Sequence, residues 1–410
     1  MVNIVLTEKQ EEGIKLAKKW WHGDERNKRP FVIQGIAGAG KSTLVSSIIE
    51  GLGLSLEQVR YCSFTGTSAL NLSKKGNPAS TIHRLIYHPF VNKQTHKVSF
   101  TLKDPDDFPS ISLIVIDEVG MINEKLYNDL ASFGVPILAL GDKEQLKQFS
   151  GQGLDLLDHP DVVLNEPMRQ SLDSPILALA YKVLRGEKIS PRDSSENGLI
   201  IVPKNQIPDE YLTSADQIIV GRNKTVQELT DRIRHQIFGL EGPYPYANEK
   251  LMCLKNDWDN FITTNNFEQY LTNGLTGFAD NFSSFNKGLK TFKMNFSPLL
   301  GSTEADTKFK SIIADGLYFS DGIRKEDDFY TKENKEKYHK IMFKRKVEED
   351  TNFTKIGKFY YGYAETAYKA QGSEFDNVLY VDDLWGGKDM VRRQRYVAIT
   401  RAKKNLVVAI

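Results

Sequence analysis

Short apolar runs alternate with polar and helical segments through the first part of the chain. Residues 31–33 form such a run before a glycine-rich turn, and residues 44–52 beyond that turn have helical character. Further runs, each followed by polar residues or a helical segment, lie at 60–64, 113–116 and 137–140. Strands that are apolar on both faces are typical of a parallel sheet with helices on either side. This part of the chain is therefore predicted to form an α/β domain.

The same alternation returns further along the chain. An apolar run at 217–220 precedes a predicted helix over 225–237, and two more strands are expected at 377–381 and 406–410. The stretch 256–355 is rich in Asn, Phe, Tyr and Lys and shows little periodicity, which indicates an insertion in the second domain. The predicted domains are 1–165, then 166–255 joined with 356–410, with the insertion at 256–355 between them.

A smaller interruption falls inside the first domain. Residues 87–109 break the strand–helix pattern, and the alternating residues 97–102 (Lys-Val-Ser-Phe-Thr-Leu) predict one arm of a β-hairpin. We therefore place a hairpin insertion at residues 86–109.

Composition narrows the class of protein. The 410 residues are 40% hydrophobic and 26% charged, which is ordinary for a globular protein, and the formal net charge of +1 neither requires nor excludes a polyanionic partner. Cys62 and Cys253 lie far apart without metal-ligand spacing, so we expect small buried residues in a reducing compartment. The apolar runs are too short to span a bilayer, and the N-terminus lacks a signal-peptide pattern. We expect a cytoplasmic protein without a membrane partner.

The glycine-rich turn fits the pattern G-x-x-x-x-G-K-[ST]. In this pattern backbone N–H groups wrap a phosphate chain at a helix N-terminus, a lysine reaches the β- and γ-phosphates, and a hydroxyl ligates Mg²⁺. Lys41 and Ser42 suit these two roles. A chance glycine-rich turn is the alternative, and the flanking strand and helix disfavour it. The expected nucleotide-binding residues are Gly35, Ala37, Gly38, Ala39, Gly40, Lys41, Ser42 and Thr43.

Two acidic residues follow the apolar run at 113–116. Asp117 is expected to hold Mg²⁺ beside the P-loop hydroxyl, and Glu118 to orient the attacking water. Without the P-loop, these acids would indicate only the solvated start of a loop. The strand at 137–140 also ends in polar residues. Because ligands bind at the carboxyl ends of parallel strands, we place Gln145 as a sensor of the γ-phosphate.

Three further residues complete the expected ATP site. Arg169 and Arg401 are candidates for stabilising the negative charge of phosphoryl transfer, although a single arginine is more often a surface group. Gln10, within residues 6–10, has the donor and acceptor needed to pair with adenine. This short match is not specific by itself.

In their order along the chain, these segments resemble the motifs of superfamily 1 helicases of the 5′→3′ branch, and within it the RecD/Dda-like group. The match touches both ends of the chain, and its last two segments are long and specific. The matching segments are residues 7–10, 35–43, 64–69, 80–83, 117–121, 141–146, 165–169, 364–374 and 394–402.

The resemblance implies two RecA-like domains that clasp ATP between them, with Arg169 and Arg401 reaching the γ-phosphate and Glu374 in the nucleotide site. It also implies an SH3-like barrel at 256–355 and a β-hairpin pin at 87–109 that splits the duplex. Single-stranded DNA is expected on the face opposite the nucleotide. The expected DNA-binding residues are Phe64, Thr65, Thr67, His83, Phe100 of the pin, Thr366, Tyr368, Lys369 and Gln371.

Plainer interpretations of several residues stay open. Phe64 is equally explained by core packing, His83 by a packed or capping role, and Phe100 by ordinary sheet packing. The chain also departs from the family pattern at positions that bear on DNA contacts more than on the ATP site. These departures are Tyr368 in place of His, Lys147-Gln148 in place of Pro-Pro, and Gly120 in place of Ser.

The predicted function is ATP- and Mg²⁺-dependent unwinding of DNA, with 5′→3′ translocation on single strands, in replication, recombination or repair. The expected partners are single-stranded DNA and duplex junctions, together with single-strand-binding or replisome proteins. We expect a monomer in the cytoplasm, of the host cell if the protein is phage-encoded. Three alternatives stay open: an RNA helicase, a translocase that does not unwind, and a nucleotide-gated binding module without catalysis. A metabolic kinase fits the P-loop but not the segments near the C-terminus.

Overall fold

The computed structural model describes residues 6–91, 98–108, 110–146, 155–168, 173–263, 268–283, 285–299, 308–320, 341, 344–345 and 356–410. The chain divides into two compact units. The first unit contains Met1–His88, Leu102–Gly221 and Ala370–Ile410, and the second contains Pro89–Thr101 and Arg222–Lys369.

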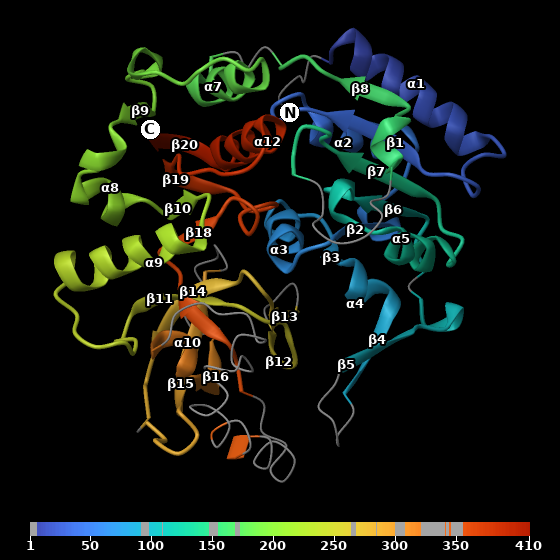
Figure 1. Ribbon diagram of the computed structural model, residues 1–410. Coiled ribbons are helices and arrows are strands. Elements are labelled where there is room, and N and C mark those ends of the chain that lie inside the picture. Colours follow the sequence, from blue (N-terminus) through green and yellow to red (C-terminus); the bar gives the residue numbers. More distant parts are fainter. Residues whose placement is uncertain are drawn as a thin grey trace. The chain divides into compact units, whose positions relative to one another are not determined.

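The first unit contains a six-stranded sheet whose neighbouring strands run parallel. Its central strands are apolar runs that the sequence predicts, and they are almost wholly buried. In spatial order the strands are β3 (Ala79–Thr81), β2 (Val59–Ser63), β6 (Leu113–Ile116), β7 (Ile137–Gly141), β1 (Phe31–Gly35) and β8 (Val162–Leu164) (Figure 1).

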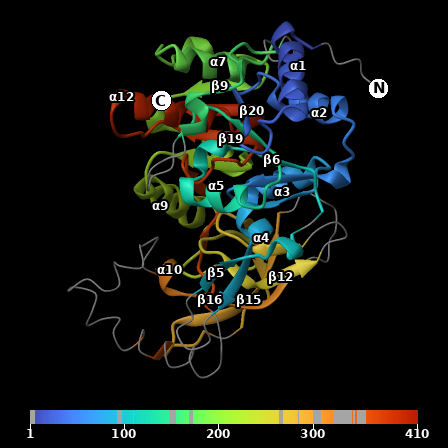
Figure 2. The same ribbon diagram turned by 90° about the vertical axis from the view of Figure 1, so that its right-hand side faces the viewer.

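Alternate residues of these strands pack on opposite faces of the sheet, as the pleat requires. Phe31 and Ile33 of β1 lie in one apolar cluster with Leu44, whereas Val32 lies in a second cluster with Leu126. The first cluster draws on α1 (Glu8–His22) and α2 (Lys41–Gly51), and the second on α4 (Ile82–Ile86) and α5 (Glu124–Ala131). Helices α1 and α2 lie side by side in both views (Figures 1 and 2), and α3 (Gly66–Lys74) follows β2.

Local sequence sets the start of the helices that border the glycine-rich turn. Thr7 and Gln10 form a reciprocal capping box at the start of α1: Thr7 Oγ1 accepts from the Gln10 N–H at 3.3 Å, and Gln10 Oε1 accepts from the Thr7 N–H at 2.9 Å. Helix α2 begins after Gly40, whose φ of 81° lies in the left-handed region that favours glycine. The chain therefore turns sharply from β1 into α2.

A second parallel sheet lies in the same unit. In spatial order its strands there are β10 (Gln217–Val220), β19 (Phe375–Val381), β20 (Ala402–Ala409) and β9 (Leu199–Val202). Its helices are α7 (Pro175–Leu184), α8 (Asp209–Ser214) and α12 (Lys388–Ile399). Helices α7 and α12 pack against each other, and both contact β20.

The second unit is built around a five-stranded antiparallel sheet. In spatial order its strands are β16 (Phe309–Asp315), β15 (Thr291–Pro298), β14 (Thr276–Asp280), β11 (Glu249–Cys253) and β17 (Phe359–Tyr361). Two further pairs of strands are β12 (Asp257–Thr263) with β13 (Glu268–Leu271), and β4 (Tyr87–Val91) with β5 (Val98–Leu102). The other elements are α9 (Asn223–Asp231), a π-helical turn (Arg232–Ile237), α10 (Leu317–Ser320) and β18 (Ala364–Thr366).

The predicted fold class is confirmed, because two parallel α/β sheets form the core of the first unit. The predicted boundaries of the insertion need correction. Strands β11 and β17 belong to the antiparallel sheet, so the insertion begins before residue 256 and ends after residue 355. An SH3-like barrel for this insertion stays a prediction. In the described part of the chain, no helix combines the length and apolar character needed to cross a bilayer.

A buried ion pair joins the π-helical turn to the antiparallel sheet. The Arg234 and Glu249 side chains are only 2% and 4% exposed, with Nε and Oε1 at 2.7 Å. Arg234 also donates to the carbonyl oxygens of Gly242 and Tyr244, both at 2.9 Å. Its guanidinium lies 4.2 Å from the ring centroid of Tyr361. Because the cation is so completely enclosed, the loss of its carboxylate partner would leave a buried charge without compensation.

We therefore expect Glu249→Ala to destabilise the second unit strongly, by about 3–5 kcal/mol. Calorimetric unfolding measures this as a lower transition temperature for part of the molecule. Glu228→Ala is the matched control, because Glu228 pairs with Lys224 at 3.5 Å on the exposed surface of α9 and should contribute little. Equal transition temperatures for the two variants would contradict a stabilising role for the buried pair.

Candidate nucleotide and nucleic-acid sites

The glycine-rich turn between β1 and α2 has the backbone geometry of a phosphate-binding loop. Gly38 and Gly40 have φ values of 74° and 81°, which only glycine adopts easily. The Lys41 amine folds back over the loop, where it donates to the carbonyl oxygens of Gly35 at 2.6 Å and Ile36 at 3.2 Å. The predicted residues Gly35, Ala37, Gly38, Ala39, Gly40, Lys41, Ser42 and Thr43 all lie on this turn or in the first turn of α2.

Two predicted acids lie directly after β6. The Asp117 carboxylate accepts from the Glu118 N–H at 3.0 Å, and Glu118 itself has a left-handed φ of 56°. Burial raises the pKa of both carboxyls, while the positive charge of Lys41 acts in the opposite direction on each. The acids and the P-loop lysine therefore belong to one electrostatic site.

The loop after β7 supplies the next part of this site. Gln145 Nε2 donates to Glu118 Oε1 at 3.3 Å. Its Oε1 is buried and has no hydrogen-bond partner among the residues that the structure describes. Arg393 of α12 donates to the backbone carbonyl of Gln145 at 3.0 Å and to that of Lys143. The loop thus holds, beside Glu118, a buried amide oxygen without a hydrogen bond from any described residue.

Arg401 approaches the same site from the second sheet. Its guanidinium is buried and donates to the Val397 carbonyl at 3.1 Å and the Ser373 carbonyl at 3.2 Å. The positive charge of Arg401 lowers the pKa of Glu118, which places the two groups within electrostatic reach. Arg169, the other predicted arginine, lies outside the described residues. The neighbouring Met168 donates its N–H to the Gly38 carbonyl at 3.1 Å.

Gln10 and Glu374, the other predicted nucleotide ligands, already have protein partners. Gln10 is fully buried, and besides its capping role its Nε2 donates to the Gly40 carbonyl at 3.3 Å. Glu374 is partly exposed and pairs with Lys75 at 3.2 Å. The structure places Gln10 beside the P-loop, but its contact with adenine and the contact of Glu374 with the nucleotide stay predictions.

Five residues of this region were not singled out by the sequence. They are Asp142, Tyr181, Arg392, Arg393 and Tyr396, of which Arg392 Nη1 bonds Glu144 Oε2 at 2.5 Å. Asp142 and Tyr396 lie inside the segments 141–146 and 394–402, so the family resemblance includes both residues, but no role was assigned to either. Tyr181 lies in a plain apolar helix, and only its place in the fold reveals its contact with the P-loop.

The predicted DNA-binding residues of the first unit are largely engaged with the protein. Phe64 packs on an apolar cluster and lies edge-on to His83, with ring centroids 6.1 Å apart. Thr65 caps α3 by accepting from the Ser68 N–H at 3.2 Å. Gln371 is buried and donates to the Leu146 carbonyl at 3.0 Å. Thr67 is half-buried beside Thr65. The packed interpretation of Phe64 and His83 therefore has support, while DNA contact stays a prediction.

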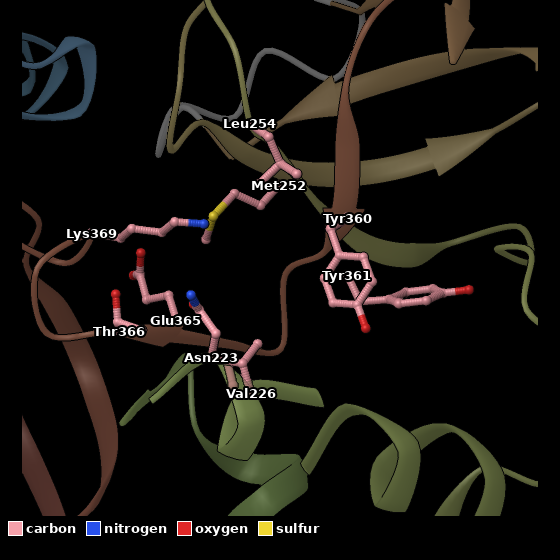
Figure 3. A pocket seen from close by; sticks show the side chains of 10 residues that line it. Asn223, Val226, Met252, Leu254, Tyr360, Tyr361, Glu365, Thr366 and Lys369 are labelled. Carbon is pink, nitrogen blue, oxygen red and sulfur yellow. The ribbon is translucent and has the colours of Figure 1, made fainter. Parts of the chain in front are cut away.

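A pocket in the second unit is lined in part by the segment 364–374, which resembles a helicase motif. It has ≈ 230 Å³ of space, counting the part open to solvent. In Figure 3 the Lys369 amine, the Thr366 hydroxyl and the Asn223 amide face this space, with Met252 and Tyr360 across from them. Burial lowers the pKa of the Lys369 amine, which makes an incoming anion a favourable partner. Glu365 lines the same pocket (Figure 3), and its negative charge acts to raise the pKa of Lys369, so a phosphate would compete with this carboxylate for the amine. Contact of this pocket with the nucleic-acid backbone stays a prediction. Tyr368 is half-buried next to Lys369 in the sequence.

The hairpin strands carry exposed aromatic residues. Phe100 on β5 is 41% exposed, and Phe90 on β4 is 59% exposed. Ser99 Oγ donates to the Phe90 carbonyl at 3.3 Å, so the two strands are joined near both rings. Exposure argues against the alternative that Phe100 is an ordinary core residue.

Two family models match this chain. An AAA domain matches residues 25–200, which include the P-loop, the two acids and Gln145. A UvrD-like helicase C-terminal domain matches residues 361–409, which include Lys369 and Arg401. The two halves of the candidate ATP site thus fall in the two matched regions.

Curated relatives cover parts of the chain. The ATP-dependent RecD2 DNA helicase of Deinococcus radiodurans is 33% identical over 171 residues, which cover 39% of this chain and 22% of the relative. The ATP-dependent DNA helicase dda of Enterobacteria phage T4 is 31% identical over 153 residues, which cover 35% of this chain and 33% of the relative. The chain therefore spans a third or less of the length of these relatives.

The whole chain is similar in fold to a solved helicase. Pif1 helicase from Bacteroides, in complex with ADP-AlF3 and single-stranded DNA, matches 100% of this chain and 93% of its own, with a TM-score of 0.54 and 14% identity. At this identity the likeness establishes the fold.

The lowered pKa of Lys369 gives a test of the pocket. A lysine with a lowered pKa loses its charge as the pH rises through that value. The affinity for single-stranded DNA should therefore begin to fall at a lower pH than it would for a contact made by an ordinary lysine. Lys369→Arg should remove this dependence, because arginine stays protonated up to about pH 12. Fluorescence anisotropy with a labelled oligonucleotide, from about pH 7 to about pH 9.5, measures both.

Lys224→Arg on the exposed face of α9 is the matched control and should keep the wild-type pH profile. If Lys369→Arg and wild type weakened in parallel as the pH rises, Lys369 would not contact the phosphate.

Proposed function

We propose that this chain, which belongs to the superfamily 1 helicases of the 5′→3′ branch, uses ATP hydrolysis to move along single-stranded DNA and separate duplex DNA. The observation that carries the proposal is the composite site in the first unit. Lys41, Asp117 and Glu118 come from the first sheet, and Arg401 comes from the second. A site divided in this way converts the binding and loss of a phosphate into relative movement of the two sheets.

Each residue of the site has a distinct part in hydrolysis. Lys41 exchanges its bonds with the P-loop carbonyls for phosphate oxygens, and Arg401 stabilises the negative charge of the transition state. Glu118 accepts one proton from the attacking water, and Gln145 Oε1 accepts a hydrogen bond from the O–H that remains. Arg169 is proposed as a second cation on the γ-phosphate, on the ground of the family resemblance alone.

Ser42 and Asp117 are the residues proposed to hold Mg²⁺. The Ser42 hydroxyl is exposed in the first turn of α2, and the Asp117 carboxylate shares the field of Lys41, so both are oxygen donors of the kind that Mg²⁺ prefers. When bound, the ion would neutralise charge on the β- and γ-phosphate oxygens.

The nucleic-acid contacts are proposed to lie in both units. The half-buried Phe64, Thr65, Thr67 and His83 would act from the first unit, while the pocket of Thr366 and Lys369 would hold the backbone in the second. Backbone contacts of this kind do not read sequence, as a translocating motor requires. We further propose that the protein acts as a monomer at single-strand junctions in the cytoplasm, of the host cell if it is phage-encoded, beside single-strand-binding or replisome proteins.

Unwinding should follow the polarity of the family. With ATP and Mg²⁺, we expect the protein to open duplexes that carry a 5′ single-stranded tail and to leave 3′-tailed and blunt duplexes closed. Lys41→Ala should lose DNA-stimulated ATP hydrolysis by about a hundredfold or more, because the β- and γ-phosphates lose their cation. Lys28→Ala, on an exposed loop lysine, is the control that should keep activity.

Opening of 3′-tailed duplexes alone would place the chain in the other branch. Equal stimulation of ATP hydrolysis by matched RNA and DNA oligonucleotides would favour an RNA-directed motor.

The exposed hairpin ring should matter for unwinding but not for translocation. Phe100→Ala removes a ring able to stack on the first base pair, so fewer base pairs should open per ATP, while DNA-stimulated ATP hydrolysis stays near wild type. Phe278→Ala is the matched control, because Phe278 on β14 is also 41% exposed and lies on another strand pair. Unchanged unwinding per ATP in Phe100→Ala would favour a translocase that strips proteins without a pin.

A further inference from the structure

Tyr396 is a buried phenol that bridges the P-loop and the loop after β7. It lies on α12, and its side chain is wholly enclosed. Its hydroxyl oxygen accepts from the Ala37 N–H at 2.7 Å. The same hydroxyl donates to Asp142 Oδ2 at 2.6 Å. Asp142 is in turn fixed, because its Oδ1 accepts from the Glu144 N–H at 2.9 Å.

The Tyr396 hydroxyl that forms the bridge keeps its proton. Burial and the negative charge of Asp142 raise the pKa of the Tyr396 hydroxyl well above its ordinary value. A neutral phenol offers one donor and an acceptor oxygen, and both are used here. The bridge is therefore a fixed hydrogen-bond connection, and its loss would leave the Ala37 N–H and Asp142 short of a partner.

A second tyrosine holds the same P-loop residue from its other side. Tyr181 on α7 donates its hydroxyl to the Ala37 carbonyl at 2.6 Å. Helices α7 and α12 pack together on the second sheet. The N–H and the carbonyl of Ala37 are thus both bound by side chains of helices that pack on the second sheet, although Ala37 lies in the P-loop that follows a strand of the first sheet.

The bridge also reaches the catalytic arginine. The Tyr396 carbonyl accepts from the Thr400 hydroxyl at 2.9 Å, and Thr400 Oγ1 accepts from Arg401 Nη2 at 3.1 Å. A short chain of bonds therefore runs from the P-loop backbone, through one residue of α12, to the guanidinium proposed to contact the γ-phosphate.

We propose that Tyr396 is a positioning residue for ATP hydrolysis, which fixes the P-loop and Asp142 to the helix end that presents Arg401. Tyr181 supports it by holding the Ala37 carbonyl. Neither tyrosine contacts the reacting atoms in this scheme; they set where Arg401 stands relative to the phosphates. The inference rests on the proposed ATP-driven function.

A matched control separates positioning from simple stability. Tyr380 of β19 is as fully buried as Tyr396, and its hydroxyl donates to Asp382 Oδ1 at 2.8 Å. Tyr396→Phe and Tyr380→Phe thus each remove a buried hydroxyl and keep the ring, but only the first changes contacts of the P-loop. A role limited to stability predicts similar effects for both.

The test uses Tyr396→Phe, Tyr181→Phe and Tyr380→Phe in the whole chain. We measure kcat for DNA-stimulated ATP hydrolysis, the dissociation constant of ADP, and the unfolding temperature by calorimetry. Tyr396→Phe is expected to lower kcat by about tenfold, because two hydrogen bonds are lost, and Tyr181→Phe by about two- to threefold, because one is lost. ADP affinity should stay within about twofold in both, because the P-loop amides and Lys41 still hold the phosphates.

Three results would overturn the proposal: an unchanged or raised kcat in Tyr396→Phe, an equal fall in Tyr380→Phe, or a loss of ADP affinity as large as the loss of kcat. If Tyr396→Phe did not fold, Tyr181→Phe would be the deciding variant. A wild-type kcat in Tyr181→Phe would refute a positioning role for the hydrogen bonds to Ala37. Absence of ATP hydrolysis in the wild-type chain would instead refute the proposed function.

Discussion

Burial of negative charge beside the P-loop is the constraint on which the rest of the first unit depends. Burial raises the pKa of Asp117, Glu118 and Asp142, so each carboxylate needs a nearby cation to stay ionised. Lys41 acts on all three from the first sheet, and Arg401 acts on Glu118 from the second. Because the compensating charges come from both sheets, the electrostatic balance of the site depends on how the sheets face each other. A triphosphate, which adds negative charge, would shift that balance toward closer approach of the cations.

Two cations of the second unit, Arg234 and Lys369, differ in how far their surroundings satisfy them. Arg234 is fully satisfied by Glu249, two backbone carbonyls and an aromatic ring, so it has no capacity for a ligand. Lys369 lines a pocket with an opening to solvent, and burial lowers the pKa of its amine while Glu365 acts to raise it. A cation that its surroundings disfavour gains most from an incoming phosphate. The contrast separates a cation whose bonding capacity is used within the fold from one that borders a pocket in the same unit.

The parts of the fold that were predictable are those with local signals. The apolar strand at 113–116 and the glycine turn before Lys41 are set by neighbouring residues, and the structure has both. The existence of the insertion was predicted but its strands were not, because β12 and β15 contain register shifts that break the alternation of a regular strand. Tyr181 carries no signal either, since its role depends on a helix contact far along the sequence. For Gln371 a sequence signal was present, because it lies in a family motif. Its amide, however, donates to the Leu146 carbonyl inside the protein.

Helix α12 connects the two sheets of the first unit through several side-chain contacts. Arg392 and Tyr396 lie one turn apart, so they project from the same side of the helix, and Arg393 lies beside them. Each reaches the first sheet's loops: Arg392 bonds Glu144, Arg393 bonds the Gln145 carbonyl, and Tyr396 bonds Asp142 and the P-loop. A helix moves as a rigid element, so these contacts cannot break one at a time without strain in the others. A displacement at one end of α12 would therefore act on all of these contacts together, which is the behaviour expected of a two-state element.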